Sequence, residues 1–364
     1  RAVALVLLFL CFVVFCQAHR FEPVEKHVID TQEGQQVLSW DEVRDMLRNN
    51  VGLMDRSYLP DFNMHKIPTL QPSLPENCTR QKLVDSLIDL LDINFVDQSL
   101  AEFSQFWNRF YTSQFGVKSA EWVQSQYLKM ISESPGLSGA SVRFVNHTWP
   151  QPSVIATIEG IGNNKDEVVI IGAHLDSVNW DAQNQDISRA PGACDDGSGT
   201  VTVMEVFRVI AESGVTFNRT IEFHHYAAEE VGLLGSQDIA NQYAEQQKRV
   251  AGYLNFDMDA YPGDPALFNI ITDYTDDTLN ALFMQLIENY ATIGYTTSDC
   301  GYGCSDHASW NQAAYRASFA IENGPYTEAH GPDDKLEYLF LPYLLEYCRV
   351  ALGFLVEIGT WGEQ

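Results

Sequence analysis

Two adjacent glutamates, Glu229 and Glu230, lie between apolar residues in the string AAEEVGLLGSQD, residues 227–238. Neighbouring side chains in a strand point to opposite faces, so from a strand interior the two carboxylates could not serve one site. The end of a strand, where a turn begins, removes this restriction. The pair then suits metal-assisted hydrolysis, in which one carboxylate binds a metal ion and the other accepts a proton from water. A solvated surface pair is the alternative.

Three further strings carry side chains that bind metals, two at the end of an apolar run and one in a glycine-rich turn that leads into a helix. GAHLDSV brings His174 and Asp176, PGACDDGSG brings Asp195, and NFDMDAY brings Asp257, while His330 follows in EAHGPDD. On extended chain Asp176 shares a face with His174 and could accept its second ring N–H, as carboxylates do beside metal-bound histidines. Each string alone has a structural explanation, such as an aspartate cap. Their coincidence at successive strand ends indicates a metal site.

Nitrogen and carboxylate ligands in this mixture suit zinc. The candidates are too many for one tetrahedral ion that keeps an open position. They suffice for two Zn²⁺ per chain if one aspartate bridges the ions, and two such ions can share a water. The candidate ligands are His174, Asp195, Glu230, Asp257 and His330.

The elements that must position these residues alternate along the chain. Runs of strand length occur at 153–160, 167–174, 220–227 and 252–259, with helical patterns at 200–214 and 233–248. This order predicts an α/β fold with a mostly parallel, mixed central sheet sandwiched between helices. In such open sheets, ligand sites lie at the carboxyl ends of the strands, where the candidate ligands occur.

These strings resemble those of the M28 family of co-catalytic zinc aminopeptidases, particularly the secreted bacterial and fungal leucine aminopeptidases. The resemblance covers about residues 80–360 and is carried by GAHLDSV, PGACDDGSG, AAEEVGLLGSQDIANQY, NFDMDAY, ITDYTD, CGYGCSDHASW and EAHGPDD. It implies a zinc-peptidase fold and the removal of single residues, preferably large and apolar, from free N-termini. Cys194 and the string HGPDD depart from the family, which often has an acidic or polar residue before the bridging aspartate and more usually HTTxD.

The resemblance also implies a role for each candidate ligand. Asp195 would bridge the two zinc ions. His174 and Asp257 would complete one zinc site, and Glu230 and His330 the other.

Further roles follow from the same resemblance. Glu229 would act as general base and later as general acid, Asp176 would orient His174, and Tyr302 would help to polarise the scissile carbonyl. The peptide bond between Asp195 and Asp196 would be cis. An apolar pocket for the first side chain would be lined by Met258, Ile271, Cys300, Cys304, Phe319 and Ile321.

Composition restricts the partners. The chain has 364 residues, 45% of them hydrophobic, which is enough for one large domain or two ordinary ones. Its formal charge of 22 − 49 = −27 at pH 7 argues against nucleic acid or an anionic membrane as partner. The partners implied by the resemblance are peptide or protein N-termini, and we expect a monomer.

The string CGYGC predicts a disulfide between Cys300 and Cys304, because Gly301 and Gly303 can take up the turn that it needs. A zinc-binding cysteine pair is the alternative, but no second pair accompanies it. Three N-x-T sequons are candidate glycosylation sites: Asn77, Asn146 and Asn218.

The first 68 residues differ from the rest. Residues 1–18 combine a basic start, a short apolar run and a small residue at Ala18, which predicts a signal peptide and a secreted, extracellular protein without a membrane span. Residues 19–68 predict a removable pro-segment and linker, or an extension that stays attached, before one catalytic domain at 69–364. In this segment Ser39 would cap a helix whose apolar face comprises Trp40, Val43, Met46, Leu47 and Leu53.

Two other functions fit parts of the pattern. A glutaminyl cyclase- or carboxypeptidase-like relative could share the scaffold, but the cyclases use a single zinc. A non-catalytic, receptor-like module would be expected to lose ligands, whereas all five candidates and Glu229 are present here. A zinc aminopeptidase is therefore the leading hypothesis.

Overall fold

The computed structural model describes residues 26–49, 51–57 and 71–360. The predicted signal peptide lies outside these ranges, as do residues 19–25, 50 and 58–68 of the predicted pro-segment and linker. Within them the strands and helices are β1 His27–Thr31, β2 Gly34–Leu38, α1 Trp40–Arg48, β3 Met54–Asp55, α2 Gln81–Ile88, α3 Ile93–Phe103, α4 Gln114–Glu133, β4 Ala140–Val145, β5 Ser153–Ile158, β6 Glu167–His174, α5 Gly197–Ser213, β7 Thr220–Tyr226, α6 Leu234–Glu245, β8 Arg249–Phe256, β9 Phe268–Ile271, α7 Asp277–Tyr290, β10 Tyr295–Ser298, α8 His307–Gln312, β11 Ala317–Glu322 and α9 Leu341–Gly359.

Eight strands of the described residues form one central sheet in the order β10-β9-β11-β8-β6-β7-β5-β4. β6 pairs in parallel with β7 and β8, β11 with β8, and β10 with β9. The antiparallel pairs are β4 with β5, β5 with β7, and β9 with β11. The four predicted strands correspond to β5, β6, β7 and β8, so the mixed sheet of an α/β fold is confirmed.

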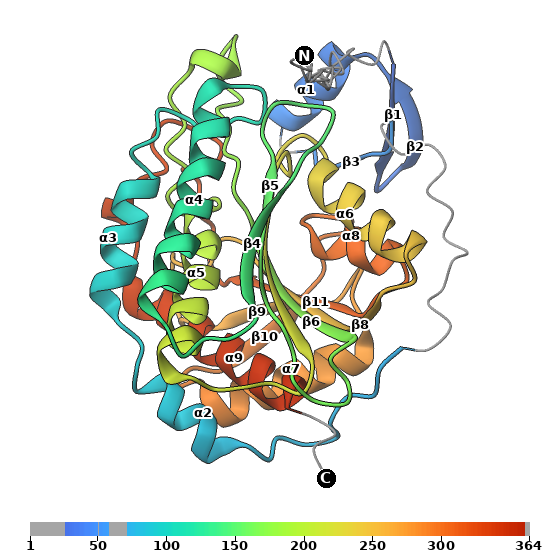
Figure 1. The fold of residues 1–364 in the computed structure, drawn as a ribbon. Coiled ribbons are helices and arrows are strands. Elements are labelled where there is room, and N and C mark those ends of the chain that lie inside the picture. The colour runs from blue at the N-terminus through green and yellow to red at the C-terminus, as the bar shows by residue number, and fades with distance from the viewer. Residues whose placement is uncertain (1–25, 50, 58–70, 361–364) are drawn as a thin grey trace, which may run out of the picture.

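Helices cover both faces of this sheet (Figure 1), with α4, α5 and α9 over one face and α6 and α8 over the other. Successive residues of β6 point to alternate faces. Val169 and Ile171 join the core under α5, whereas Val168 and Ile170 join the core under α6. Both faces are therefore apolar, which explains the uninterrupted run VVII. No helix in the described ranges is long and apolar enough to cross a membrane.

A small unit precedes the main fold, and we call residues 26–49 and 51–57 the N-terminal unit. Its strands β1, β2 and β3 form a three-stranded antiparallel sheet beside α1 (Figure 1). Ser39 caps α1 as predicted. Its hydroxyl accepts the backbone N–H of Glu42, and the Glu42 carboxylate accepts the backbone N–H of Ser39, which completes a capping box.

The prediction placed Leu53 on the same helical face, and this was wrong. α1 ends at Arg48, and Leu53 lies in the chain beyond it, where it packs with Ile29 and Val43 in a small core. The pro-segment and the retained extension both stay predictions, because the fold alone shows a packed unit under either alternative.

The three sequons differ in exposure. Asn77 and Asn146 are exposed, so glycosylation there stays a prediction. Asn218 is only 2% exposed, and its side-chain oxygen accepts the backbone N–H of Asn164 at 3.2 Å. The folded chain leaves no room for a glycan at Asn218, which corrects the prediction for that position.

Arg109 joins two loops that carry site residues. Its side chain is fully buried and lies over the ring of Phe103, with 4.2 Å between the guanidinium carbon and the ring centroid. The guanidinium donates to the carbonyls of Leu175 and Gly192, each at 2.8 Å, and to that of Pro191. Burial lowers the pKa of Arg109 to about 10, so it stays charged at neutral pH. One side chain thus ties the loop after β6 to the loop before α5.

Changing Arg109 to Leu removes a donor from three buried carbonyls, and only that of Gly192 keeps another donor, the backbone N–H of Gly197 at 3.0 Å. Since each unsatisfied buried acceptor costs about 1–3 kcal/mol and two are left, we expect the free energy of unfolding to fall by about 2 kcal/mol or more. Urea unfolding followed by tryptophan fluorescence measures this loss. The control is Arg44→Leu, because the ion pair that Arg44 makes among the described residues is with the exposed Asp41, at 2.7 Å, and the change should alter stability by less than about 0.5 kcal/mol. Equal losses in both variants would contradict the role of Arg109.

Candidate active site

The predicted metal-binding residues and Glu229 meet near the carboxyl ends of the central strands. Most of them end or closely follow a buried strand, so their backbone is fixed by the sheet while their side chains are free to leave it. They are His174 at the end of β6, Asp195 before α5, Glu229 and Glu230 after β7, Asp257 after β8 and His330 between β11 and α9.

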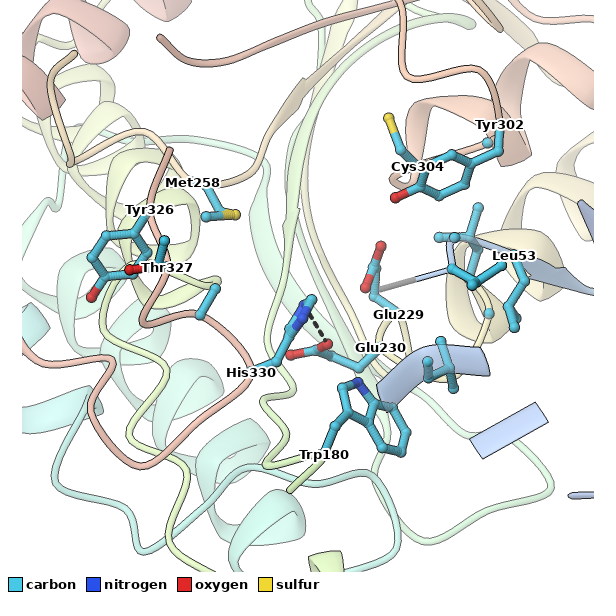
Figure 2. Close-up of a pocket in the computed structure, with 17 residues that line it drawn as sticks. Leu53, Trp180, Glu229, Glu230, Met258, Tyr302, Cys304, Tyr326, Thr327 and His330 are labelled. Atoms are coloured by element: carbon cyan, nitrogen blue, oxygen red, sulfur yellow. Dashed lines mark ion pairs between the residues drawn. The ribbon is translucent and has the colours of Figure 1, made fainter. Parts of the chain in front are cut away.

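Asp195 lies between two histidines. Its Oδ1 is 3.0 Å from Nε2 of His174, and its Oδ2 is 3.0 Å from Nε2 of His330. Oδ1 of Asp257 lies 3.7 Å from the same His174 nitrogen, and Oε2 of Glu230 lies 3.2 Å from that of His330 (Figure 2). Each oxygen of one carboxylate thus faces its own histidine–carboxylate pair, as a ligand that bridges two metal ions must do.

Buried atoms in this cluster also lack ordinary partners. Neither ring nitrogen of His174 makes a hydrogen bond, and Oε1 of Glu230 is also without a hydrogen-bond partner. Buried polar atoms are rarely left in this state, and imidazole nitrogen and carboxylate oxygen are zinc ligands. On the other side, ligand atoms of Asp195, Glu230 and His330 all lie within 4.8 Å of one another. The residues present therefore fit two zinc ions.

Asp196 is also close to the site, but we exclude it as a ligand. One of its oxygens lies within 4.8 Å of ligand atoms of His174 and Asp257. Its carboxylate, however, accepts the backbone N–H of His174 at 3.1 Å and of Met258 at 3.3 Å, and it caps α5. Asp196 thus fixes the backbone of two strand ends. Its peptide bond to Asp195 is cis, as the resemblance implied.

Asp176 has a wider role than the sequence predicted. Its Oδ1 lies 3.4 Å from Nδ1 of His174, on the side expected for an orienting carboxylate. The same oxygen accepts the backbone N–H of Glu229 at 3.0 Å, and Oδ2 accepts that of Glu230 at 3.2 Å. One carboxylate thus ties the end of β6 to the turn that carries both glutamates. This answers how two adjacent carboxylates can serve one site.

Three loops of the site contain backbone that L-residues rarely adopt. Ala228 has φ 60°, Met258 has φ 57° and His330 has φ 57°, all in the left-handed region. Each such residue costs about 1–3 kcal/mol and persists where the surroundings enforce it, which is common at functional sites. The strain falls next to Glu229, next to Asp257 and at His330 itself.

The crowding of carboxylates shifts their pKa values. Burial, together with neighbouring carboxylates, raises the pKa of Glu229 and of Glu230 well above the usual range. Burial also acts on Asp195, but the contacts with His174 and His330 outweigh it and lower the pKa of that carboxyl. Bound cations would stabilise the ionised form of the whole group. The site therefore favours the binding of cations.

Tyr302 lies in a loop closed by the predicted disulfide between Cys300 and Cys304, which is present. Burial and the nearby Glu229 raise the pKa of Tyr302 to about 12. The phenol therefore stays protonated at neutral pH and can donate a hydrogen bond. Figure 2 shows its ring on the same side of the cavity as Glu229.

A cavity of about 410 Å³ opens beside Glu229, Glu230 and His330 (Figure 2). This volume lies within the usual range for small-molecule sites. Two of the six predicted pocket residues line it: Met258 and Cys304. The other four lie outside its lining, so their contact with a substrate stays a prediction: Ile271, Cys300, Phe319 and Ile321. Part of the wall comes instead from the N-terminal unit, through Leu47, Val51, Gly52 and Leu53.

Sequence reasoning missed Asp334, which holds the bridging residue in place. Its carboxylate accepts the backbone N–H of Cys194 at 2.8 Å and of Asp195 at 2.9 Å, and the hydroxyl of Tyr326 at 2.8 Å. The loop that carries His330 is thereby fastened to the loop that carries Asp195. The paired aspartates of HGPDD were the available signal.

Comparison with known proteins agrees with this site. Peptidase family M28 matches residues 153–355. The chain is 36% identical to Leucine aminopeptidase 1 of Fusarium vanettenii over 354 residues, 93% of this chain and 89% of that protein. It is 40% identical to Leucine aminopeptidase 1 of Metarhizium robertsii over 300 residues, 78% of this chain and 74% of that one.

The fold has a close counterpart among solved structures. The crystal structure of the LapA aminopeptidase of Legionella pneumophila superposes with a TM-score of 0.81 at 28% identity, covering 94% of this chain and 100% of that one. The family match contains all five candidate ligands, and the fungal likeness extends over most of the chain. This chain is therefore a peptide hydrolase that belongs to peptidase family M28.

Proposed function

We propose that this chain is a secreted zinc aminopeptidase that removes N-terminal residues from peptides with a free α-amine. The observation that carries the proposal is Asp195, whose two oxygens each face a histidine paired with a second carboxylate. This geometry supports two zinc ions per chain with Asp195 as the bridging ligand. The names of the fungal relatives support a preference for large apolar first residues.

Secretion has separate support. Residues 1–18 have the composition of a signal peptide. The disulfide between Cys300 and Cys304 suits an oxidising compartment.

The chain's own residues divide the chemistry. Paired zinc ions supply Lewis acidity and make a water more acidic. Glu229 belongs to neither ligand group, and its Oε2 lies 4.0 Å from Nε2 of His174. It is thus placed to accept the proton of an attacking water and to pass it to the leaving amine. Asp176 fixes the backbone of Glu229. The protonated Tyr302 donates to the carbonyl oxygen as negative charge develops there.

The test is release of free leucine from leucine amide, with and without a zinc chelator. We expect cleavage that stops on chelation and returns when zinc is added. Chelator-resistant cleavage would contradict the proposal. A chain that binds the amide without cleaving it would be a binding module, and one that instead cyclises N-terminal glutamine with a single zinc would be a cyclase relative.

The two adjacent glutamates should respond differently to the same change. Glu229→Gln should keep about two zinc ions per chain while turnover falls by about 10²–10⁴-fold, the usual loss of general acid–base help. Glu230→Gln, the matched control, should lower the zinc content because it removes a ligand. Metal analysis and turnover are measured on the same samples. If the first variant loses zinc and the second keeps it, the two roles are reversed.

The free amine should be essential. The carboxylates of this cleft suit a cationic or metal-bound amine, and acetylation removes that charge and adds bulk. Sites built to engage a polar group reject analogues that lack it by about 10⁴-fold or more. We therefore expect leucyl peptides to be cleaved and their N-acetyl counterparts to be untouched at equal concentration. Comparable rates would indicate an endopeptidase.

A further inference from the structure

The loop from Cys300 to Cys304, which carries Tyr302, is held from two sides. On one side the carboxylate of Asp273 accepts the backbone N–H of Cys300 at 3.0 Å and of Gly301 at 2.7 Å. The other side faces the N-terminal unit. The position of the Tyr302 ring therefore depends on two parts of the chain that are remote in sequence.

The turn between β1 and β2 makes one of the contacts. Nε2 of Gln32 donates to the carbonyl oxygen of Cys300 at 3.0 Å. A Cβ atom at Gly301 would lie only 2.4 Å from that same nitrogen. The turn and the loop thus lie so close together that a side chain larger than glycine at position 301 would displace Gln32.

A second contact joins Gly52 of the N-terminal unit to the ring of Tyr302. A Cβ atom at this position would lie 1.8 Å from both Cε2 and Cζ of Tyr302. The Gly52 backbone therefore lies directly against the ring, at the carbon that bears the hydroxyl. The φ angle of Gly52 is outside the left-handed region. Glycine is thus needed here for close approach and not for backbone conformation.

The N-terminal unit is itself fastened to the main fold around the cavity. Arg48 donates to the carbonyls of Trp180 and Ala182, each at 2.7 Å. At β3, the backbone N–H of Asp55 donates to the carbonyl of Gly232, in the turn after β7, at 3.2 Å. The unit is anchored on both the Trp180 side and the glutamate side, so it can act as a fixed support.

We propose that the N-terminal unit positions Tyr302 for catalysis and that Gly52 sets the place of its hydroxyl. The inference rests on the proposed role of Tyr302 as donor to the scissile carbonyl. A catalytic group misplaced by about 1 Å can lose about 100-fold in rate. The unit touches no reacting atom and acts through the Tyr302 ring. On this proposal the unit belongs to the active enzyme and would be an extension that stays attached.

The test is Gly52→Ala in the full chain, since the added methyl must displace the ring. We expect kcat for leucine amide to fall by about 10–100-fold while KM changes by less than about threefold. The control is Gly136→Ala, where an added Cβ meets nothing within 4 Å and φ is outside the left-handed region; it should leave both constants unchanged. An unchanged kcat in Gly52→Ala would overturn the proposal. A raised kcat would also overturn it and would indicate an inhibitory pro-segment.

Tyr302→Phe provides the decisive background, because phenylalanine keeps the ring but lacks the hydroxyl. If Gly52 acts through that hydroxyl, Gly52→Ala should cause almost no further loss of kcat in the Tyr302→Phe enzyme. An equal loss in both backgrounds would show that Gly52 acts otherwise. Should Tyr302→Phe alone keep full kcat, the proposed role of Tyr302 fails. Should it lower kcat while Gly52→Ala does not, only the positioning fails.

Gln32 offers a second variant in case Gly52→Ala does not fold. Gln32→Ala removes one exposed hydrogen bond to the loop without adding volume. We expect kcat to fall by about 2–10-fold, in line with the loss of one neutral hydrogen bond. This loss should disappear in the Tyr302→Phe background. A loss that persists there would contradict the proposal.

Discussion

The contact of one carboxylate with two imidazoles, at Asp195, is the constraint on which the site depends. Its oxygens lie 3.0 Å from His174 and 3.0 Å from His330. Each histidine also faces a second carboxylate: Asp257 lies beside His174, and Glu230 lies beside His330. A group this acidic and this buried is costly unless positive charge compensates it. The two divalent ions that we propose would supply that charge, and the surrounding loops would have to hold their ligands at fixed separations.

The fold meets this demand mainly with carboxylates that accept backbone N–H groups. Asp176 ties the end of β6 to the turn after β7. Asp196 ties the end of β6 to the residue after Asp257. Asp334 ties the late loop to Asp195. Each bond joins a ligand-bearing loop to a neighbour, so the ligands are placed by their supports as much as by the sheet. Arg109 adds a cation that serves the same purpose through carbonyls.

The central strands and the candidate ligands were predictable because their signals are local. A strand such as VVIIGAH carries its burial and its terminal histidine in consecutive residues, and AAEE follows its strand directly. The supports were not predictable, because they act over long separations: Asp334 bonds to Asp195 from 139 residues away, and Arg109 to Leu175 from 66. Leu53 was misplaced because helical spacing continued past the last helical residue. Asn218 was misjudged because a sequon carries no information on burial.

The cavity wall is a second feature that the sequence alone did not predict. Composition separated residues 19–68 from the rest of the chain, and they were interpreted as a pro-segment and linker, or an attached extension, before the catalytic domain. In the fold, Leu47, Val51 and Leu53 line the cavity. A change in composition thus marks where one unit of the chain ends, but not whether that unit contributes to the active site.

The central claim is a pair of zinc ions bridged by Asp195. Crystals grown with zinc and measured at the zinc absorption edge test it most directly. We predict two anomalous peaks about 3.5–4 Å apart, one between Asp195, His174 and Asp257 and the other between Asp195, Glu230 and His330. A single peak, or two peaks that do not share Asp195, would contradict it.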